Sequence, residues 1–144
     1  MKKLLLLLLA LPLLAFAEKA PVGVTYEAKI LRINDGDTVT IAAPYLPAPL
    51  KPQLSVRIYG VDTPETGYRA KCEDENLKGQ AAKEFARAAV KQSQQRLVVI
   101  YDWDKYGGRI LGDIILDGQS LRGMLIQNGL AREYYGSAKT SWCQ

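Results

Sequence analysis

The sequence Arg57-Ile58-Tyr59-Gly60-Val61-Asp62-Thr63-Pro64-Glu65 decides how the chain can be arranged. Its first half alternates apolar and polar side chains, which predicts a strand. Pro64 fixes its own backbone angle and keeps Thr63 out of the helical region, so the chain leaves the strand extended. We expect a corner there, with the carboxylates of Asp62 and Glu65 close to the Thr63 carbonyl. Such oxygens beside an arginine suit a hard cation and a phosphate.

The chain opens with a segment typical of a secretory signal. Two lysines precede an apolar run from Leu4 to Ala17, which ends in Ala-Phe-Ala. A membrane anchor is the alternative, but a spanning helix needs about 20 apolar residues. We therefore predict a cleaved signal peptide over residues 1–17 and a single domain over residues 18–144. The mature protein would be secreted or periplasmic and would not associate with the membrane.

The composition excludes several classes of catalysis. The chain contains no histidine, which rules out Ser-His-Asp and Cys-His mechanisms and histidine general bases. With only two cysteines, a zinc site is also disfavoured. Any chemistry must therefore use carboxylates, arginines, tyrosines and an oxygen-bound metal. Without the signal, 17 basic and 15 acidic residues would remain, and this small excess does not by itself indicate a nucleic-acid partner.

The two cysteines are Cys72 and Cys143. In an exported chain an isolated pair usually forms one disulfide, and two free thiols are the alternative. A disulfide would tie the C-terminal tail to the region just after the Asp62–Glu65 corner.

The order of the predicted elements indicates a small barrel. Residues 25–33 and 38–41 alternate around an Asp-Gly turn and predict a hairpin, while the proline-rich residues 42–52 form a long connection. Three strands, a helix, two strands and a second helix suggest an α+β fold with a five-stranded, closed OB-type barrel. The remaining predicted elements are strand 54–61, helix 73–94 with Leu77, Ala81, Phe85 and Ala88 on its apolar face, strand 97–101, strand 109–116 and helix 120–128.

Parity along the strands connects Asp37 to Asp62. Both carboxylates have the core-facing parity of their strands, but they lie at strand ends, where a buried carboxylate needs a cation or a donor. One divalent ion between them would satisfy both, and oxygen ligands favour Ca²⁺ over Mg²⁺. Arg57 has the opposite parity, so only strand twist or a bulge would bring it to the same place. Arg109, which follows two glycines, is the other candidate for binding a phosphate.

These motifs together resemble the staphylococcal nuclease (thermonuclease) family. The resemblance covers about residues 25–135 and implies an OB-fold with a Ca²⁺-dependent phosphodiesterase activity on DNA and RNA. The matching stretches are Asp35-Gly36-Asp37-Thr38, Arg57 five residues before Asp62-Thr63-Pro64-Glu65, Asp104-Lys105-Tyr106-Gly107 with Arg109, and Gln127-Asn128-Gly129-Leu130-Ala131.

The resemblance also implies a role for each matching residue. The Ca²⁺ ligands would be the carboxylates of Asp37 and Asp62 and the carbonyl of Thr63, with Asp35 behind them. Glu65 would activate or orient the attacking water. The remaining roles are phosphate binding and charge stabilisation for Arg57 and Arg109, and the lining of the nucleotide pocket for Tyr106 and Tyr135.

The sequence departs from the family pattern in three places. Gly108 is an extra glycine before Arg109, and it either acts as a bulge that restores the aim of this arginine or moves it off the phosphate. The 42–52 connection is long for its hairpin and could reshape the substrate entrance. The tail is too short for the family's usual C-terminal helix, and the Cys72–Cys143 disulfide could replace that anchor.

Two other functions are compatible with this sequence. One is a catalytically inactive OB-fold module that only binds nucleic acid, and the other is a disulfide-stabilised interaction domain of the cell envelope. A degenerate binder would be expected to have lost at least one of the catalytic or metal-binding residues, and none is missing. The sequence therefore favours a monomeric, exported nuclease.

Overall fold

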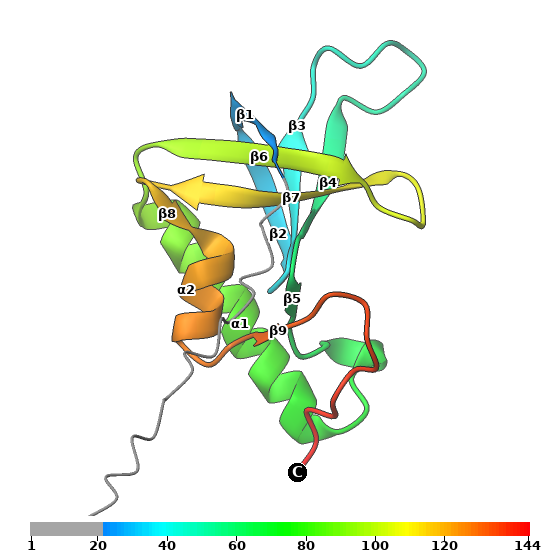
Figure 1. Cartoon of the computed structure of the whole chain (residues 1–144), viewed down its shortest axis with the longest axis vertical. Helices are drawn as coiled ribbons and strands as arrows, with labels where there is room; N and C mark the ends of the chain where they lie inside the picture. Colours follow the sequence, from blue (N-terminus) through cyan, green and yellow to red (C-terminus); the bar gives the residue numbers. More distant parts are fainter. Residues whose placement is uncertain (1–21) are drawn as a thin grey trace, which may run out of the picture.

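One mixed β-sheet forms the centre of the computed structural model, which describes residues 22–144. Two α-helices lie on one side of this sheet, and the C-terminal segment runs past the first turn of the longer helix (Figure 1). The predicted signal peptide, residues 1–17, lies outside the described residues. Among the helices of residues 22–144, none combines the length and the apolar content that crossing a bilayer requires.

The elements largely follow the sequence prediction. The helix predicted over 73–94 ends at Gln92, and the strand predicted over 109–116 has those bounds. The single strand predicted over 25–33 is two strands. The elements are β1 (Val24–Glu27), β2 (Ile30–Asp35), β3 (Thr38–Ala42), β4 (Gln53–Ile58), β5 (Val61–Asp62), η1 (Gly67–Arg69), α1 (Glu73–Gln92), β6 (Arg96–Trp103), β7 (Arg109–Leu116), β8 (Gln119–Ser120), α2 (Leu121–Gln127) and β9 (Arg132–Glu133).

The strand order of the main sheet is β1-β6-β7-β4-β3-β2, with β8 beside β7. The β4–β7 pair is parallel and the other pairs are antiparallel. The OB-like α+β class is thus confirmed, but the sheet is not closed into a barrel by hydrogen bonds. Within residues 22–144 no ladder joins β1 to β2, the two ends of the path. β1 and β2 are joined through the chain at Ala28 and Lys29, and each pairs with a different strand. The single strand predicted over 25–33 is therefore two strands.

The two-residue turn between β2 and β3 and the close approach of α1 position the corner. Gly36 and Asp37 form the turn, one residue later than the Asp35-Gly36 centre that the sequence predicted, because Asp35 still belongs to β2. A Cβ atom added to Gly79 of α1 would lie 2.5 Å from the Glu65 carbonyl oxygen and 2.7 Å from that of Pro64. Glycine at this position therefore lets the helix pack directly on the backbone that follows β5.

The core lies between the sheet and the two helices. Its fully buried side chains include Val39, Val56, Ile114 and Leu125. The apolar face predicted for α1 was displaced by about one position, because Leu77 is 57% exposed whereas Gly79, Ala82 and Ala86 are buried. Small residues face the sheet because they allow the helix backbone to come close.

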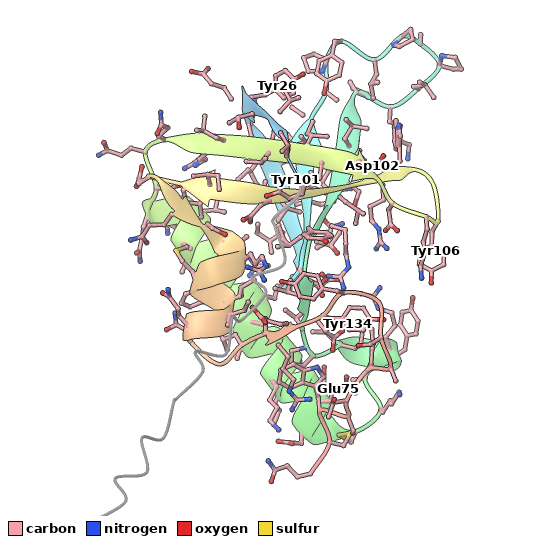
Figure 2. All side chains as sticks on the ribbon, viewed as in Figure 1. Tyr26, Glu75, Tyr101, Asp102, Tyr106 and Tyr134 are labelled. Carbon is pink, nitrogen blue, oxygen red and sulfur yellow. A yellow bond between two sulfur atoms is a disulfide. The ribbon has the colours of Figure 1, made fainter. Side chains whose placement is uncertain are left out.

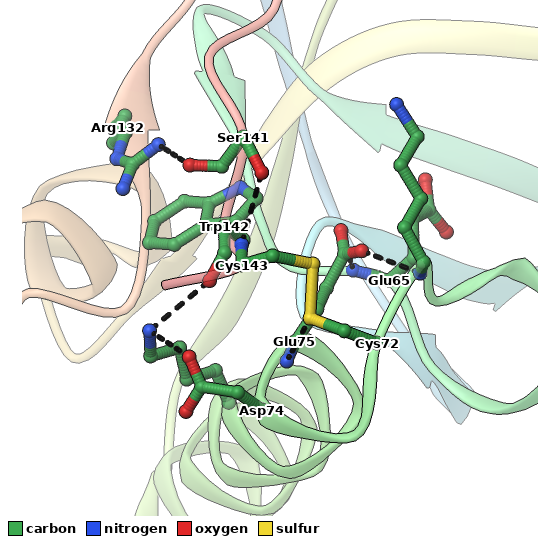
Figure 3. Close-up of a disulfide and its surroundings, with 10 residues drawn as sticks. Glu65, Cys72, Asp74, Glu75, Arg132, Ser141, Trp142 and Cys143 are labelled. Atoms are coloured by element: carbon green, nitrogen blue, oxygen red, sulfur yellow. Dashed lines mark hydrogen bonds and ion pairs between the residues drawn. A yellow bond between two sulfur atoms is a disulfide. The ribbon is translucent and has the colours of Figure 1, made fainter.

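A disulfide joins Cys72 to Cys143, with their Cα atoms 6.1 Å apart (Figure 3). Cys72 is also the N-terminal cap of α1, where its sulfur accepts a hydrogen bond from the Glu75 amide at 3.4 Å. The predicted pairing is therefore present. It fixes the tail at the end of α1 that lies beside the corner.

Candidate active site

Asp37 and Arg57 form the first part of the candidate site. The β3–β4 register places Thr38 opposite Arg57, so the arginine lies beside the turn that carries Asp37. The guanidinium forms an ion pair with the Asp37 carboxylate and donates a hydrogen bond to the Val61 carbonyl at 3.1 Å. Strand alternation alone did not aim Arg57 at this carboxylate. The long side chain at the end of β4 reaches it nevertheless.

The Asp37 carboxylate also reaches the corner predicted after β5. Its Oδ2 atom accepts a hydrogen bond from the Thr63 amide at 3.2 Å, and its Oδ1 atom accepts one from the Thr38 hydroxyl at 3.1 Å. Burial alone would raise the pKa of Asp37, but the Arg57 charge and the hydrogen bonds with Asp35 and Thr63 outweigh burial and lower it. Asp37 is therefore held ionised and connects the hairpin to the corner.

Arg69 joins Asp35 to Glu65. Its guanidinium lies 3.1 Å from Asp35 Oδ2 and 3.3 Å from Glu65 Oε2. Burial, followed by repulsion from Asp37, raises the pKa of Asp35 to about 6. Glu65 is more exposed, with 36% of its side chain accessible, so it remains available to solvent at the edge of this cluster.

Asp62 has partners that the sequence did not predict. The Trp142 indole N–H donates to Oδ2 at 3.0 Å, and the Lys139 ammonium lies 2.6 Å from Oδ1. Burial would lower the pKa of Lys139, but the hydrogen bond and charge of Asp62 raise it. Asp62 therefore directly precedes Thr63, whose amide binds Asp37. The carboxylate of Asp62 is held by the C-terminal segment.

Arg109 pairs with a carboxylate of its own turn. Its Nε atom donates to Asp104 Oδ2 at 2.6 Å, and 32% of its side chain is exposed. Gly107 and Gly108 both have positive φ angles, 69° and 65°, and a Cβ at either position would meet nothing within 4 Å. The extra glycine therefore belongs to an open turn. Arg109 still lines the cleft that contains most of the predicted site.

A cleft of about 560 Å³ gathers most of the predicted site. Figure 2 shows Tyr106 on the β6–β7 turn and Tyr134 on the C-terminal segment, and both line this cleft. Tyr106 is 76% exposed, and Tyr135 is 47% exposed. The lining includes seven of the predicted residues, namely Asp35, Asp37, Arg57, Glu65, Tyr106, Arg109 and Tyr135. Asp62 and Thr63 are buried and do not belong to it.

The proline-rich connection does not line this cleft. It projects past the end of the sheet opposite the C-terminal segment (Figure 1). Its residues Leu46, Leu50 and Lys51 line a second hollow of about 360 Å³, which shares Trp103 with the cleft. The connection therefore borders the cleft only through this exposed tryptophan.

The family described as "Staphylococcal nuclease homologue" matches residues 55–142. The chain belongs to the staphylococcal nuclease family. A similar curated protein is "Endonuclease YhcR" of Bacillus subtilis (strain 168), which is 30% identical over 116 residues. The match covers 76% of this chain but only 9% of that protein, so the chain spans a small part of its relative.

The charges of this staphylococcal nuclease domain leave room for a cation. Within residues 22–144, no three Asp, Glu, Cys or His side chains are grouped closely enough to hold a metal ion as they stand. Four carboxylates of the predicted site form ion pairs with three cationic side chains. The carboxylates are those of Asp35, Asp37, Asp62 and Glu65, and the cations are Arg57, Arg69 and Lys139. The donors are oxygens, which suit Ca²⁺, provided that Lys139 leaves Asp62.

Sequence reasoning missed several residues of the site. Arg69 could have been found from its spacing of four residues after Glu65. Lys139 and Trp142 could have been found from the predicted disulfide, because fixing Cys143 near the corner also brings its neighbours there. Buried Glu75, whose carboxylate accepts from the Glu65 amide at 3.3 Å and the Lys71 amide at 2.7 Å, gave no comparable signal.

Proposed function

We propose that this chain is an exported, Ca²⁺-dependent nuclease that hydrolyses phosphodiester bonds of DNA and RNA. The main support is that one cleft in a staphylococcal nuclease domain is lined by Asp37, Arg57, Glu65 and Arg109 together with exposed tyrosines. The endonuclease name of a relative agrees with this activity.

The two arginines would bind the scissile phosphate. A phosphodiester is already anionic, and attack by water adds charge that guanidinium groups can stabilise. Arg57 is held between Asp37 and the Val61 carbonyl, which would fix its orientation before substrate arrives. Arg109, whose side chain is 32% exposed, would have to exchange Asp104 for the phosphate.

Glu65 would accept a proton from the attacking water or orient it. A carboxylate is ionised at neutral pH, though it is then a weak base. Arg69 lies 3.3 Å from Glu65 Oε2 and would limit its rotation. Tyr106 and Tyr135 would line the nucleotide pocket, where exposed aromatic rings can stack on bases.

Asp37, Asp62 and the Thr63 carbonyl would hold Ca²⁺, with Asp35 supporting them. When bound, the ion would supply positive charge beside the phosphate. The disulfide supports the proposal of an exported protein, secreted or periplasmic, because such bonds persist in oxidising compartments. We further propose that the mature chain is a monomer without membrane association.

Digestion of single-stranded DNA and RNA by purified residues 18–144 tests this function. We expect cleavage of both polymers with Ca²⁺ and none after addition of a chelator. Equal digestion in both conditions would refute the metal dependence. Binding without digestion in either condition would favour the catalytically inactive OB-fold module.

A further inference from the structure

The C-terminal strap, defined as residues 134–143, is fixed beside the corner at several points (Figure 3). Trp142 is 8% exposed and precedes the cysteine that is joined to Cys72. The Arg132 guanidinium lies 3.7 Å from the centroid of the Trp142 ring and donates to the Ser141 carbonyl at 2.9 Å. Lys78 of α1 donates to the Trp142 carbonyl at 3.1 Å. Trp142 is therefore held in place by Arg132, by Lys78 and by the disulfide at the neighbouring Cys143.

The strap occupies both oxygens of Asp62, but with contacts of different kinds. The Trp142 N–H donates to Oδ2 from a buried ring that cannot leave without breaking the anchors described above. Lys139 binds Oδ1 from a side chain that is 47% exposed. Its flexible stem can move the ammonium away, and the nearby Tyr134 ring, 5.5 Å from Nζ, offers it another favourable position.

We propose that the strap belongs to the metal site: Trp142 is a positioning residue that orients the Asp62 carboxylate, and Lys139 is a resident cation that a metal ion must displace. This inference rests on the proposed function. The two residues then act in opposite directions on metal affinity. Trp142 strengthens binding because it holds a ligand in its binding orientation. Lys139 weakens binding because its charge competes for the same oxygen.

Calcium titration by isothermal calorimetry on the oxidised mature chain tests the proposal. We expect Lys139→Met to tighten Ca²⁺ binding about tenfold, through loss of a competing charge at contact distance. Trp142→Phe keeps an aromatic ring but loses the N–H donor, and we expect about tenfold weaker binding. Lys105→Met is the charge-matched control, because it removes a cleft lysine that lies over Tyr106 instead of at Asp62. It should change the affinity less than about twofold.

The outcomes separate this inference from the function on which it rests. Unchanged or weaker binding by Lys139→Met would overturn the displacement, and unchanged binding by a folded Trp142→Phe would overturn the positioning role. A wild-type chain that binds no Ca²⁺ would overturn both the inference and the metal part of the proposed function. Wild-type binding with unaltered variants would overturn the inference alone.

A metal-free measurement tests the Lys139–Asp62 pair by itself. Urea unfolding in chelator is measured for Lys139→Met, Asp62→Asn and the double variant. We expect the two changes to be coupled by about fivefold in the unfolding equilibrium constant, which is large for a half-exposed ion pair because Asp62 is buried. Additive effects would show that the pair does not form in solution and would overturn the proposal.

Discussion

Asp37 and Asp62 are both buried carboxylates of the candidate site, but their partners come from different distances along the chain. Asp37 is held by Thr38, Arg57 and Thr63, which follow it within 26 residues. Asp62 is held by Lys139 and Trp142, and the latter is 80 residues away. Asp37 is thus fixed by its own hairpin, by β4 and by the corner, whereas Asp62 depends on the tail and its disulfide.

Removal of the disulfide should have the largest effect. A bond that closes a loop with a sequence separation of 71 residues can contribute about 4 kcal/mol by restricting the unfolded chain. We expect Cys72→Ser/Cys143→Ser to lose up to about that much free energy of unfolding, measured by urea denaturation.

The same variant sharpens the comparison of the two carboxylates. Wild type with reductant should match the double variant, which serves as the control for the substitutions themselves. Under conditions where the double variant is still folded, the Lys139–Asp62 coupling should decrease, because its tether is gone. The Arg57–Asp37 coupling should remain. If the double variant lost less than about 1 kcal/mol in free energy of unfolding, the disulfide would not be an important tether of the tail.

Replacement of Arg57 should have the next largest effect. Arg57→Ala is expected to lower kcat/KM on single-stranded DNA by at least about 10²-fold, as is Glu65→Gln. Because loss of Arg57 also leaves Asp37 buried without its counter-charge, Arg57→Lys is the better folded test. It keeps the charge but not the two-point geometry and should recover little activity.

Arg87→Ala provides the control for this prediction. Arg87 pairs with Glu84 on the exposed face of α1 and does not line the cleft. Near-normal turnover by Arg57→Lys, alongside an unaffected Arg87→Ala, would mean that positive charge alone suffices. The rigid placement of Arg57 by Asp37 would then have no catalytic value.

Asp113 provides a third buried carboxylate and the smallest expected effect. Its direct donors are neutral, namely the Ser120 hydroxyl and the amides of Ile114 and Arg122. Burial raises the pKa of Asp113, and these hydrogen bonds oppose that rise only in part. The folded protein therefore binds a proton more tightly than the unfolded chain. Stability from this group should fall as the pH rises from the unfolded pKa to the higher folded pKa.

Urea unfolding between pH 3 and 7 measures this effect as the difference between wild type and Asp113→Asn. The stability of the wild type relative to the variant should decrease through that window and then become constant. An increase with pH would show that the hydrogen bonds outweigh burial, as the Arg57 charge does at Asp37.

Much of this site could be predicted from local signals. The β2–β3 hairpin needs only its flanking strands to form, although its turn lies at Gly36 and Asp37 instead of the predicted Asp35-Gly36. Pro64 bends the chain whatever surrounds it. The disulfide could be predicted because two cysteines have only one possible pairing within a chain. The residues that line the cleft were predicted where their motifs were short and continuous.

Other features depend on distances between segments that are remote in sequence. Strand parity did not aim Arg57 at Asp37, because alternation does not describe how far a long side chain reaches at the end of β4. The alternation of residues 25–33 could not reveal the break at Ala28 and Lys29, since each half pairs with a different strand. The apolar face of α1 was displaced because close packing on the corner favoured Gly79 and alanines over Leu77.

The sequence by itself determined the type of site, through carboxylates, arginines and tyrosines in the order found in one family and through the absence of histidine. Only the tertiary structure decided which charges meet, above all that Lys139 and Trp142 hold Asp62. The physical reason is that a local motif specifies backbone turns within a few residues. The partner of a buried charge is instead fixed by packing and by a covalent bond between distant segments.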